Sequence, residues 1–160
     1  MAVKSGRNGE IKLSIAPGTV APTTASALET SANLALGQIR SWSLDESVET
    51  VDATVMSTSA TGYIFRDTLP TFKTWTATVD FLYDPADATV QFNAAFVAGV
   101  VCDIAIYPEG ELAATADKIF GGRALLTSIS RSASYDGLVE CSATFEGKAT
   151  LVAGATPVDA

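Results

Sequence analysis

The sequence contains no histidine and only two cysteines, and these absences exclude several kinds of chemistry. Without histidine there is no imidazole for general acid–base catalysis or for metal ligation. Cys102 and Cys141 are too few for a structural zinc site or for a disulfide framework. We expect both to be free thiols in a core, with a disulfide between them as the alternative. The prediction is therefore a protein without cofactor or metal.

Basic residues and long apolar runs are also scarce. The chain has 10 Lys and Arg against 18 Asp and Glu, a net charge of -8, so we expect no basic nucleic-acid-binding surface. Its longest apolar run, residues 94–102, is far shorter than the roughly 20 residues that span a bilayer. Residues 1–9 lack the apolar segment of a secretory signal. We expect a soluble protein with no membrane partner, intracellular when it is synthesised.

The familiar enzyme motifs are missing as well: there is no GxSxG, P-loop, CxxC or Rossmann glycine pattern. Paired carboxylates could hydrolyse a glycoside or bind a divalent cation. Such pairs are Asp45 with Glu46, Glu49 with Asp52, and Glu109 with Glu111. We favour solvated turn residues for these pairs, because acidic side chains are seldom buried without a partner. The sequence is therefore predicted not to be an enzyme.

What the chain does contain is strand patterning across the length of one domain. It has 160 residues, 48% of them hydrophobic and 18% charged, which is typical of a globular fold. Alternation predicts strands at 11–15, 38–44, 48–56, 71–83, 100–107, 123–134 and 138–149, with a turn at 45–47. Asp84 and Pro85 predict the start of a helix that ends at Gly99. The fold class predicted is mainly β: an antiparallel sandwich or split barrel with one flanking helix and long loops.

The connecting segments are long. Residues 16–37 are predicted to form an extended arm, with a short helical turn near 26–34. Residues 57–70 and 108–122 are predicted to be loops, and 150–160 an extended tail. The loop 57–70 places aromatic and charged side chains together: Tyr63, Ile64, Phe65, Arg66 and Asp67, followed by Pro70. Aromatic residues beside arginine are typical interface anchors. The alternative is that these aromatics fold back onto the core.

The polar faces of the predicted strands are rich in hydroxyl and acidic groups. The residues concerned are Ser41, Ser43, Asp45, Thr50, Asp52, Thr54, Ser128, Ser130, Ser132, Glu140, Ser142, Thr144 and Glu146. One interpretation is the ordinary solvated face of a sheet. The other is a surface that a polyanion passes without binding, because acidic groups repel phosphates whereas lysine and arginine bind them.

The segment 39–70 contains Trp42-Ser43-Leu44, then Glu49, Asp52 and Thr54, then a Ser/Thr-rich stretch and Arg66. In these features the segment resembles the major tail tube proteins of long-tailed bacteriophages. The strand 72–83 that ends in Asp84-Pro85, the helix predicted after it and the closing hairpin are also similar to that family. Together these features cover most of residues 36–149 and depend on order and pattern more than on identity.

The resemblance implies a single tail-tube domain over 1–160, with an N-terminal strand and arm (1–37), an inter-ring loop (57–70) and a C-terminal tail (150–160). Six copies would form a ring, and rings would stack into a virion tail tube, assembled in the host bacterial cytoplasm, that conducts DNA during ejection. The polar residues named above would line the lumen, and Tyr63, Ile64, Phe65, Arg66, Asp67 and Pro70 would contact the next ring.

The partners implied by the resemblance are other copies of the chain, tail tip or initiator proteins and terminator proteins. A tape measure protein and DNA would occupy the lumen without specific binding. Three other interpretations stay open: a capsid decoration protein or other β-sandwich binding module, a subunit of a bacterial effector-secretion tube, and a carboxylate enzyme of the glycosidase type.

Overall fold

The computed structural model describes residues 9–54, 66–83, 94–110, 118–133, 135 and 137–155. Antiparallel strands dominate this part of the chain, which confirms the mainly β fold class. The elements are β1 (Glu10–Ser14), α1 (Ala25–Ser31), β2 (Leu34–Ala35), β3 (Gln38–Asp52), β4 (Thr68–Leu82), β5 (Val101–Tyr107), β6 (Lys118–Ser132), β7 (Glu140–Gly147) and β8 (Val152–Ala155). Among the described residues, no helix is long and apolar enough to cross a membrane.

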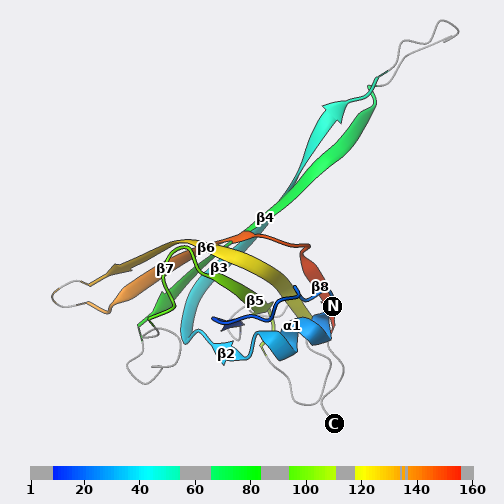
Figure 1. Cartoon of the computed structure of the whole chain (residues 1–160). Coiled ribbons are helices and arrows are strands. Elements are labelled where there is room, and N and C mark those ends of the chain that lie inside the picture. Colours follow the sequence, from blue (N-terminus) through cyan, green and yellow to red (C-terminus); the bar gives the residue numbers. More distant parts are fainter. Residues whose placement is uncertain are drawn as a thin grey trace, which may run out of the picture.

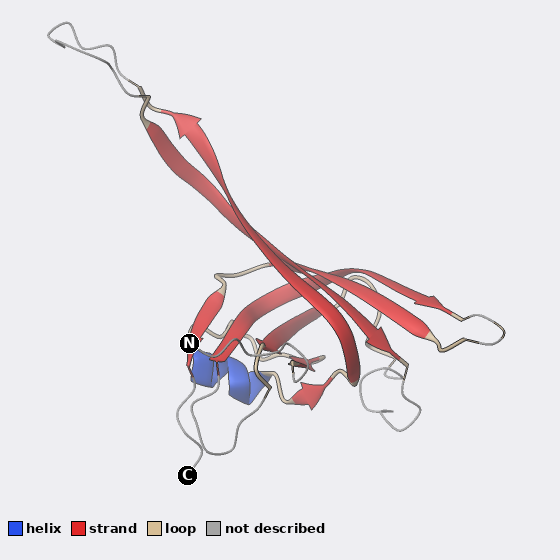
Figure 2. Cartoon of the chain, turned by 180° about the vertical axis from the view of Figure 1, so that it is seen from behind, coloured by secondary structure: helices blue, strands red, loops and turns tan. Residues whose placement is uncertain are grey.

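All eight strands belong to one sheet of order β2-β1-β5-β6-β7-β4-β3, with β8 paired to β6 beside this path. The sheet curls over its own core but does not close into a barrel (Figure 1). Two hairpins extend from the body in different directions: β3 with β4, which is much the longer, and β6 with β7 (Figures 1 and 2). Among the described strands, β3 lies at one edge of the sheet.

The turn predicted at 45–47 is wrong, because β3 runs without interruption from Gln38 to Asp52. Asp45 pairs with Thr76 and Ser47 with Thr74, so this stretch is the middle of a long hairpin with β4. Residues 45–47 contain neither Gly nor Pro, the residues that interrupt a strand most strongly. Continuing as a strand also satisfies the backbone hydrogen-bonding groups of this stretch.

Several other predicted boundaries also differ. The predicted loop 108–122 ends earlier, because β6 already begins at Lys118, and the tail 150–160 contains β8. The helix described is α1, inside the arm, with the Thr24 side chain accepting a hydrogen bond from the Ala27 amide at 3.2 Å as its N-cap. For the helix predicted at 84–99, residues 84–93 lie outside the described residues, and 94–99 form turns.

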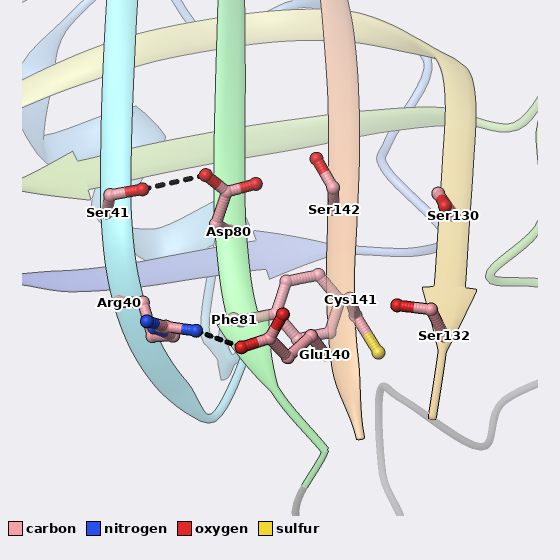
Figure 3. Close-up of a pocket in the computed structure, with 9 residues that line it drawn as sticks. All are labelled: Arg40, Ser41, Asp80, Phe81, Ser130, Ser132, Glu140, Cys141 and Ser142. Carbon is pink, nitrogen blue, oxygen red and sulfur yellow. Dashed lines mark hydrogen bonds and ion pairs between the residues drawn. The ribbon is translucent and has the colours of Figure 1, made fainter. Parts of the chain in front are cut away.

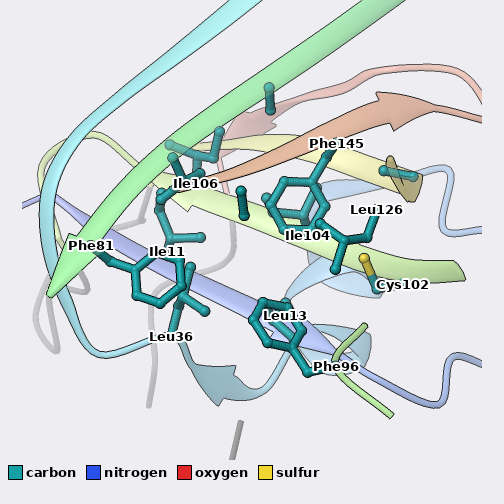
Figure 4. Close-up of a cluster of buried hydrophobic side chains, with 14 of the residues drawn as sticks. Ile11, Leu13, Leu36, Phe81, Phe96, Cys102, Ile104, Ile106, Leu126 and Phe145 are labelled. Atoms are coloured by element: carbon teal, nitrogen blue, oxygen red, sulfur yellow. The ribbon is translucent and has the colours of Figure 1, made fainter. Parts of the chain in front are cut away.

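The main core lies inside the curl of the sheet. Its apolar residues come from alternate positions of β1, β4, β5, β6 and β7. Figure 4 shows Ile11 and Leu13 of β1 on one side and Phe145 and Leu126 on the other. The predicted inward positions of 71–83, namely Trp75, Ala77, Val79 and Phe81, are all buried. Cys102 and Cys141 are buried free thiols, as predicted, and burial together with the Asp103 charge raises the pKa of Cys102 to about 12.

A second, smaller core lies between α1 and the other face of the sheet. It comprises Leu28, Ala32, Ala105, Tyr107, Ile119 and Val152. The arm therefore does not simply extend from the body: Leu28 and Leu36 are fully buried, and the Leu36 amide donates to the Ile11 carbonyl at 3.0 Å. Covering this face with α1 removes the apolar side chains of β5, β6 and β8 from water.

Gly121 in β6 offers a direct test of the pairing between β5 and β6. Its φ is +148°, and a Cβ there would lie 1.9 Å from the Ile104 carbonyl oxygen of β5. We predict that Gly121→Ala destabilises the fold by at least about 2 kcal/mol, lowering Tm by about 4 °C or more.

Gly154→Ala is the matched control, since the nearest atom to its added Cβ would be 3.6 Å away. It should change Tm little. Equal Tm values for the wild type and Gly121→Ala in thermal unfolding would contradict the described approach of β5 to β6.

Candidate functional site

The polar residues of β3, β4, β7 and β6 lie side by side on one face of the sheet. Pairing in register forms continuous cross-strand rows. One row is Ser41, Asp80, Ser142 and Ser130, and the next is Ser43, Thr78, Thr144 and Ser128. Further rows place Asp45 by Thr76 and Glu146, and Glu140 by Ser132. We call this surface, with Arg40, the polar face.

The polar face brings together ten of the residues predicted from sequence: Ser41, Ser43, Asp45, Ser128, Ser130, Ser132, Glu140, Ser142, Thr144 and Glu146. It adds Thr76, Thr78 and Asp80 of β4, which were not among them. Their signal was present in the sequence, because these polar residues alternate with the buried residues Trp75, Ala77 and Val79. The bulge that brings Arg40 to the polar face had no signal in the alternation pattern.

Local hydrogen bonds on the polar face favour the ionised form of Asp80. The Ser41 hydroxyl donates to Asp80 Oδ2 at 2.8 Å, and this bond, then one from Ser142 and the charge of Arg40, lower the pKa of Asp80. Arg40 forms an ion pair with Glu140. Figure 3 shows these groups around a depression of about 500 Å³. The surface is thus polar, predominantly acidic and dense in hydroxyl groups.

Three predicted residues do not join this surface. Successive residues of a strand point to opposite faces. Since β3 continues past residue 45, Thr50 and Asp52 point away from the side that carries Ser43 and Asp45. Thr54 follows them at the far end of the hairpin, where its amide donates to Asp52 at 3.0 Å. The hydrogen bonds from Thr54, and one from Arg66 at 2.9 Å, lower the pKa of Asp52.

The predicted contact loop is only partly described. Tyr63, Ile64 and Phe65 lie outside the described residues. Arg66 and Asp67 are exposed at the end of the hairpin, and Pro70 belongs to β4, paired with Thr50. The loop is therefore shorter than 57–70, because β4 begins at Thr68.

The predicted acidic pairs are described except for Glu111, which lies outside the described residues. Glu46 pairs with Lys73, Asp52 with Arg66, and Glu109 with Lys118 at 3.7 Å. Over the described ranges, no three His, Cys, Asp or Glu residues come together as metal ligands would. These carboxylates neutralise neighbouring basic side chains instead.

On the opposite face, the same strands form apolar rows. One row is Trp42, Val79, Ala143 and Ile129, and the next is Leu44, Ala77, Phe145 and Leu126. Val79 and Ala143 in the middle are fully buried. Trp42 and Ile129 at the two ends are only half-buried, although both pack against the core. The first row is thus incompletely covered at both ends.

A buried ion pair attaches the arm to the body. Asp103 of β5 is fully buried and accepts hydrogen bonds from Arg123 of β6, from Nε at 2.8 Å and from Nη2 at 3.2 Å. The Ser31 hydroxyl at the end of α1 also donates to Asp103, and Arg123 Nη2 donates to the Val20 carbonyl at 3.1 Å. Hydrogen bonding to Asp103 raises the pKa of Arg123. One carboxylate therefore links β5, β6, α1 and the arm.

Comparison with known proteins finds relatives by structure alone. No protein-family model and no curated protein sequence matches the chain. Among solved structures, it is similar to a chain of "Virion of native gene transfer agent (GTA) particle", with TM-score 0.59, 14% identity, and coverage of 95% of this chain and 99% of that one. It is also similar to a chain of "Tail of empty GTA particle computed with helical refinement, C6 symmetry", with TM-score 0.60, 16% identity and the same coverage. The resemblance seen in the sequence is therefore confirmed at the level of the fold.

The ion pair predicts how the body responds when one partner is removed. Arg123→Ala leaves the carboxylate of Asp103 buried without its cation, which costs about 3–5 kcal/mol in comparable sites. We expect Tm to fall by about 10 °C. Chemical unfolding of the variant measures the loss.

The double variant Asp103→Leu with Arg123→Met is the control, because it removes both charges while keeping apolar volume. It should be more stable than Arg123→Ala. A single variant within about 1 kcal/mol of wild type would mean that the pair does not hold the arm.

Proposed function

We propose that this chain is a structural protein of a virion tail, whose copies join into hexameric rings and stack into a hollow tube. The polar face lines the lumen, and DNA passes along it. On this proposal Ser41, Ser43, Asp45, Asp80, Ser128, Ser130, Ser142, Thr144 and Glu146 face the lumen. The residues 63–67 with Pro70 reach towards the neighbouring ring.

The observation that carries the proposal is the row Trp42, Val79, Ala143 and Ile129, which is half-covered at both ends. The outer edge of β3 pairs with no other described strand, and beyond Leu126 β6 pairs with β7 alone. Setting β3 of one copy beside β6 of the next would bring Trp42 towards Ile129. Burial of that apolar surface favours association.

Such a contact joins two different edges, so it is heterologous and repeats from copy to copy. A ring results when the rotation closes, and the β3 edge and the free edge of β6 are then paired, which removes a liability of a lone open sheet. Stacking repeats a second heterologous contact without closing and gives a filament. The fold neighbour with a C6-symmetric tail supports six copies for the ring.

The chemistry of the polar face suits a passage for DNA. Cationic surfaces bind phosphates by releasing counterions, so they retain DNA. This surface carries Asp45, Asp80 and Glu146, and its Arg40 is paired with Glu140. Its serine and threonine hydroxyls keep it hydrated. DNA and a tape measure protein would occupy the lumen without specific binding, while tail tip and terminator proteins would bind the ends.

Removing apolar surface at the two edges tests this assembly. Trp42→Thr and Ile129→Thr keep a strand-forming side chain but shorten the apolar row at opposite ends. We predict that each variant stays folded and requires at least about tenfold more protein to form rings, a cost of about 1.4 kcal/mol per contact. Sedimentation velocity and negative-stain microscopy measure this.

Val20→Ser is the matched control, because Val20 is 81% exposed on the arm and belongs to neither edge strand of the apolar row. It should assemble as the wild type does. If the wild type stays monomeric at high concentration and in strongly salting-out buffer, the proposal is wrong and the decoration-protein interpretation takes its place.

A further inference from the structure

Two groups of apolar side chains are exposed at the far ends of the two hairpins. On the β3–β4 hairpin these are Val51, Leu69 and Phe72, with 55%, 56% and 71% of their surface exposed. At the β6–β7 end they are Tyr135 and Leu138, with 105% and 70% exposed. Large apolar groups clustered on a surface mark contact sites with other proteins. We call the first group the hairpin patch and the second the tip patch.

The hairpin patch continues the polar face. Residues at alternate positions of β3 share a side, so Val51 falls on the side of Ser43 and Asp45. Leu69 pairs with Val51, and Phe72 lies on the same side of β4 as Thr74 and Thr76. The surface therefore changes from polar to apolar beyond the Ser47–Thr74 pair. Apolar side chains are unfavourable on a wall that contacts water and DNA, whereas they stabilise a surface that another protein covers.

The two patches lie at opposite ends of one sheet. The β3–β4 hairpin ends beyond the pair Asp52–Thr68. The β6–β7 hairpin ends beyond the pair Ser132–Glu140, and Glu140 pairs with Leu82 at the other end of β4. Figures 1 and 2 show the two hairpins directed away from each other. A head-to-tail stack of identical copies would thus bring the hairpin patch of one copy towards the tip patch of another.

The length of the β3–β4 hairpin agrees with this pairing. Beyond the buried Trp75, β4 continues through residues 68–74, which at roughly 3.4 Å per residue is more than 20 Å of strand. Glu49, on the same side of β3 as Val51, gives this patch one acidic side chain.

We infer that the hairpin patch of one copy docks on the tip patch of a second copy in the neighbouring ring. Phe72 and Leu69 pack against Tyr135 and Leu138. This inference rests on the proposed stacking and names the partner of the hairpin: the β6–β7 end of an identical subunit. The contact is heterologous, so it gives the stack one direction.

Site-specific cross-linking tests the contact. Phe72→Cys and Tyr135→Cys are made as separate proteins, assembled together in equal amounts and treated with a short bismaleimide. Cysteines held together by docking have a high effective concentration, so we expect at least about tenfold more cross-linked dimer than from either variant alone. The native Cys102 and Cys141 are buried and should not react. Phe72→Cys mixed with Ser26→Cys, exposed on α1, is the matched control pair.

The outcomes separate this inference from the proposed function. Tubes that form without the specific cross-link overturn the docking assignment and leave the tube proposal standing. A wild type that forms neither rings nor tubes overturns both.

A charge exchange provides the second readout. Phe72→Lys and Tyr135→Glu should each give folded rings that do not stack, and mixing the two should restore stacking. If each variant alone forms tubes as long as those of the wild type, the docking assignment is wrong.

Discussion

Pairing in register among β3, β4, β7 and β6 gives the sheet two chemically different faces. Each polar row has an apolar row on its reverse, so Ser43 and Thr78 on one side correspond to Leu44 and Ala77 on the other. A slip of one residue would exchange the faces and expose the core positions to water. The core, the polar face and the half-covered row at the edges all depend on this one alignment.

The alignment explains why the monomer is incomplete as a sheet. In the middle of the apolar row, Val79 and Ala143 are covered by neighbouring strands on both sides. Trp42 and Ile129 have a neighbouring strand on one side only among the described residues. The body is nevertheless stabilised independently: the buried pair Asp103–Arg123 holds the arm and α1 over the reverse of β5 and β6. The subunit can thus fold alone and still leave apolar edges for association.

Much of this architecture could be predicted from alternation in the sequence. The inward residues of 71–83 and the strands near 123–134 and 138–149 were identified because each strand has one face towards water and one face towards the core. The turn predicted at 45–47 was wrong because three polar residues in a row are locally typical of a turn. The strand continues through them because they pair with β4, which is far along the chain. That error also placed Thr50 and Asp52 on the polar face. The buried ion pair between Asp103 and Arg123 could not be predicted, since no local pattern links a residue of β5 to Val20 and Ser31.

If the polar face encloses a lumen, assembly shields it from large molecules, and thiol accessibility measures this shielding. Ser130 is exposed on this face, so Ser130→Cys in the unassembled protein should react with both a small maleimide and a bulky polymer-linked maleimide. In assembled tubes the account predicts that the small reagent still reacts, because it diffuses along the lumen, whereas the bulky reagent does not. Reaction of assembled tubes with both reagents would place the polar face on the outside. Reaction with neither would place it inside a protein contact. Either result would contradict the account.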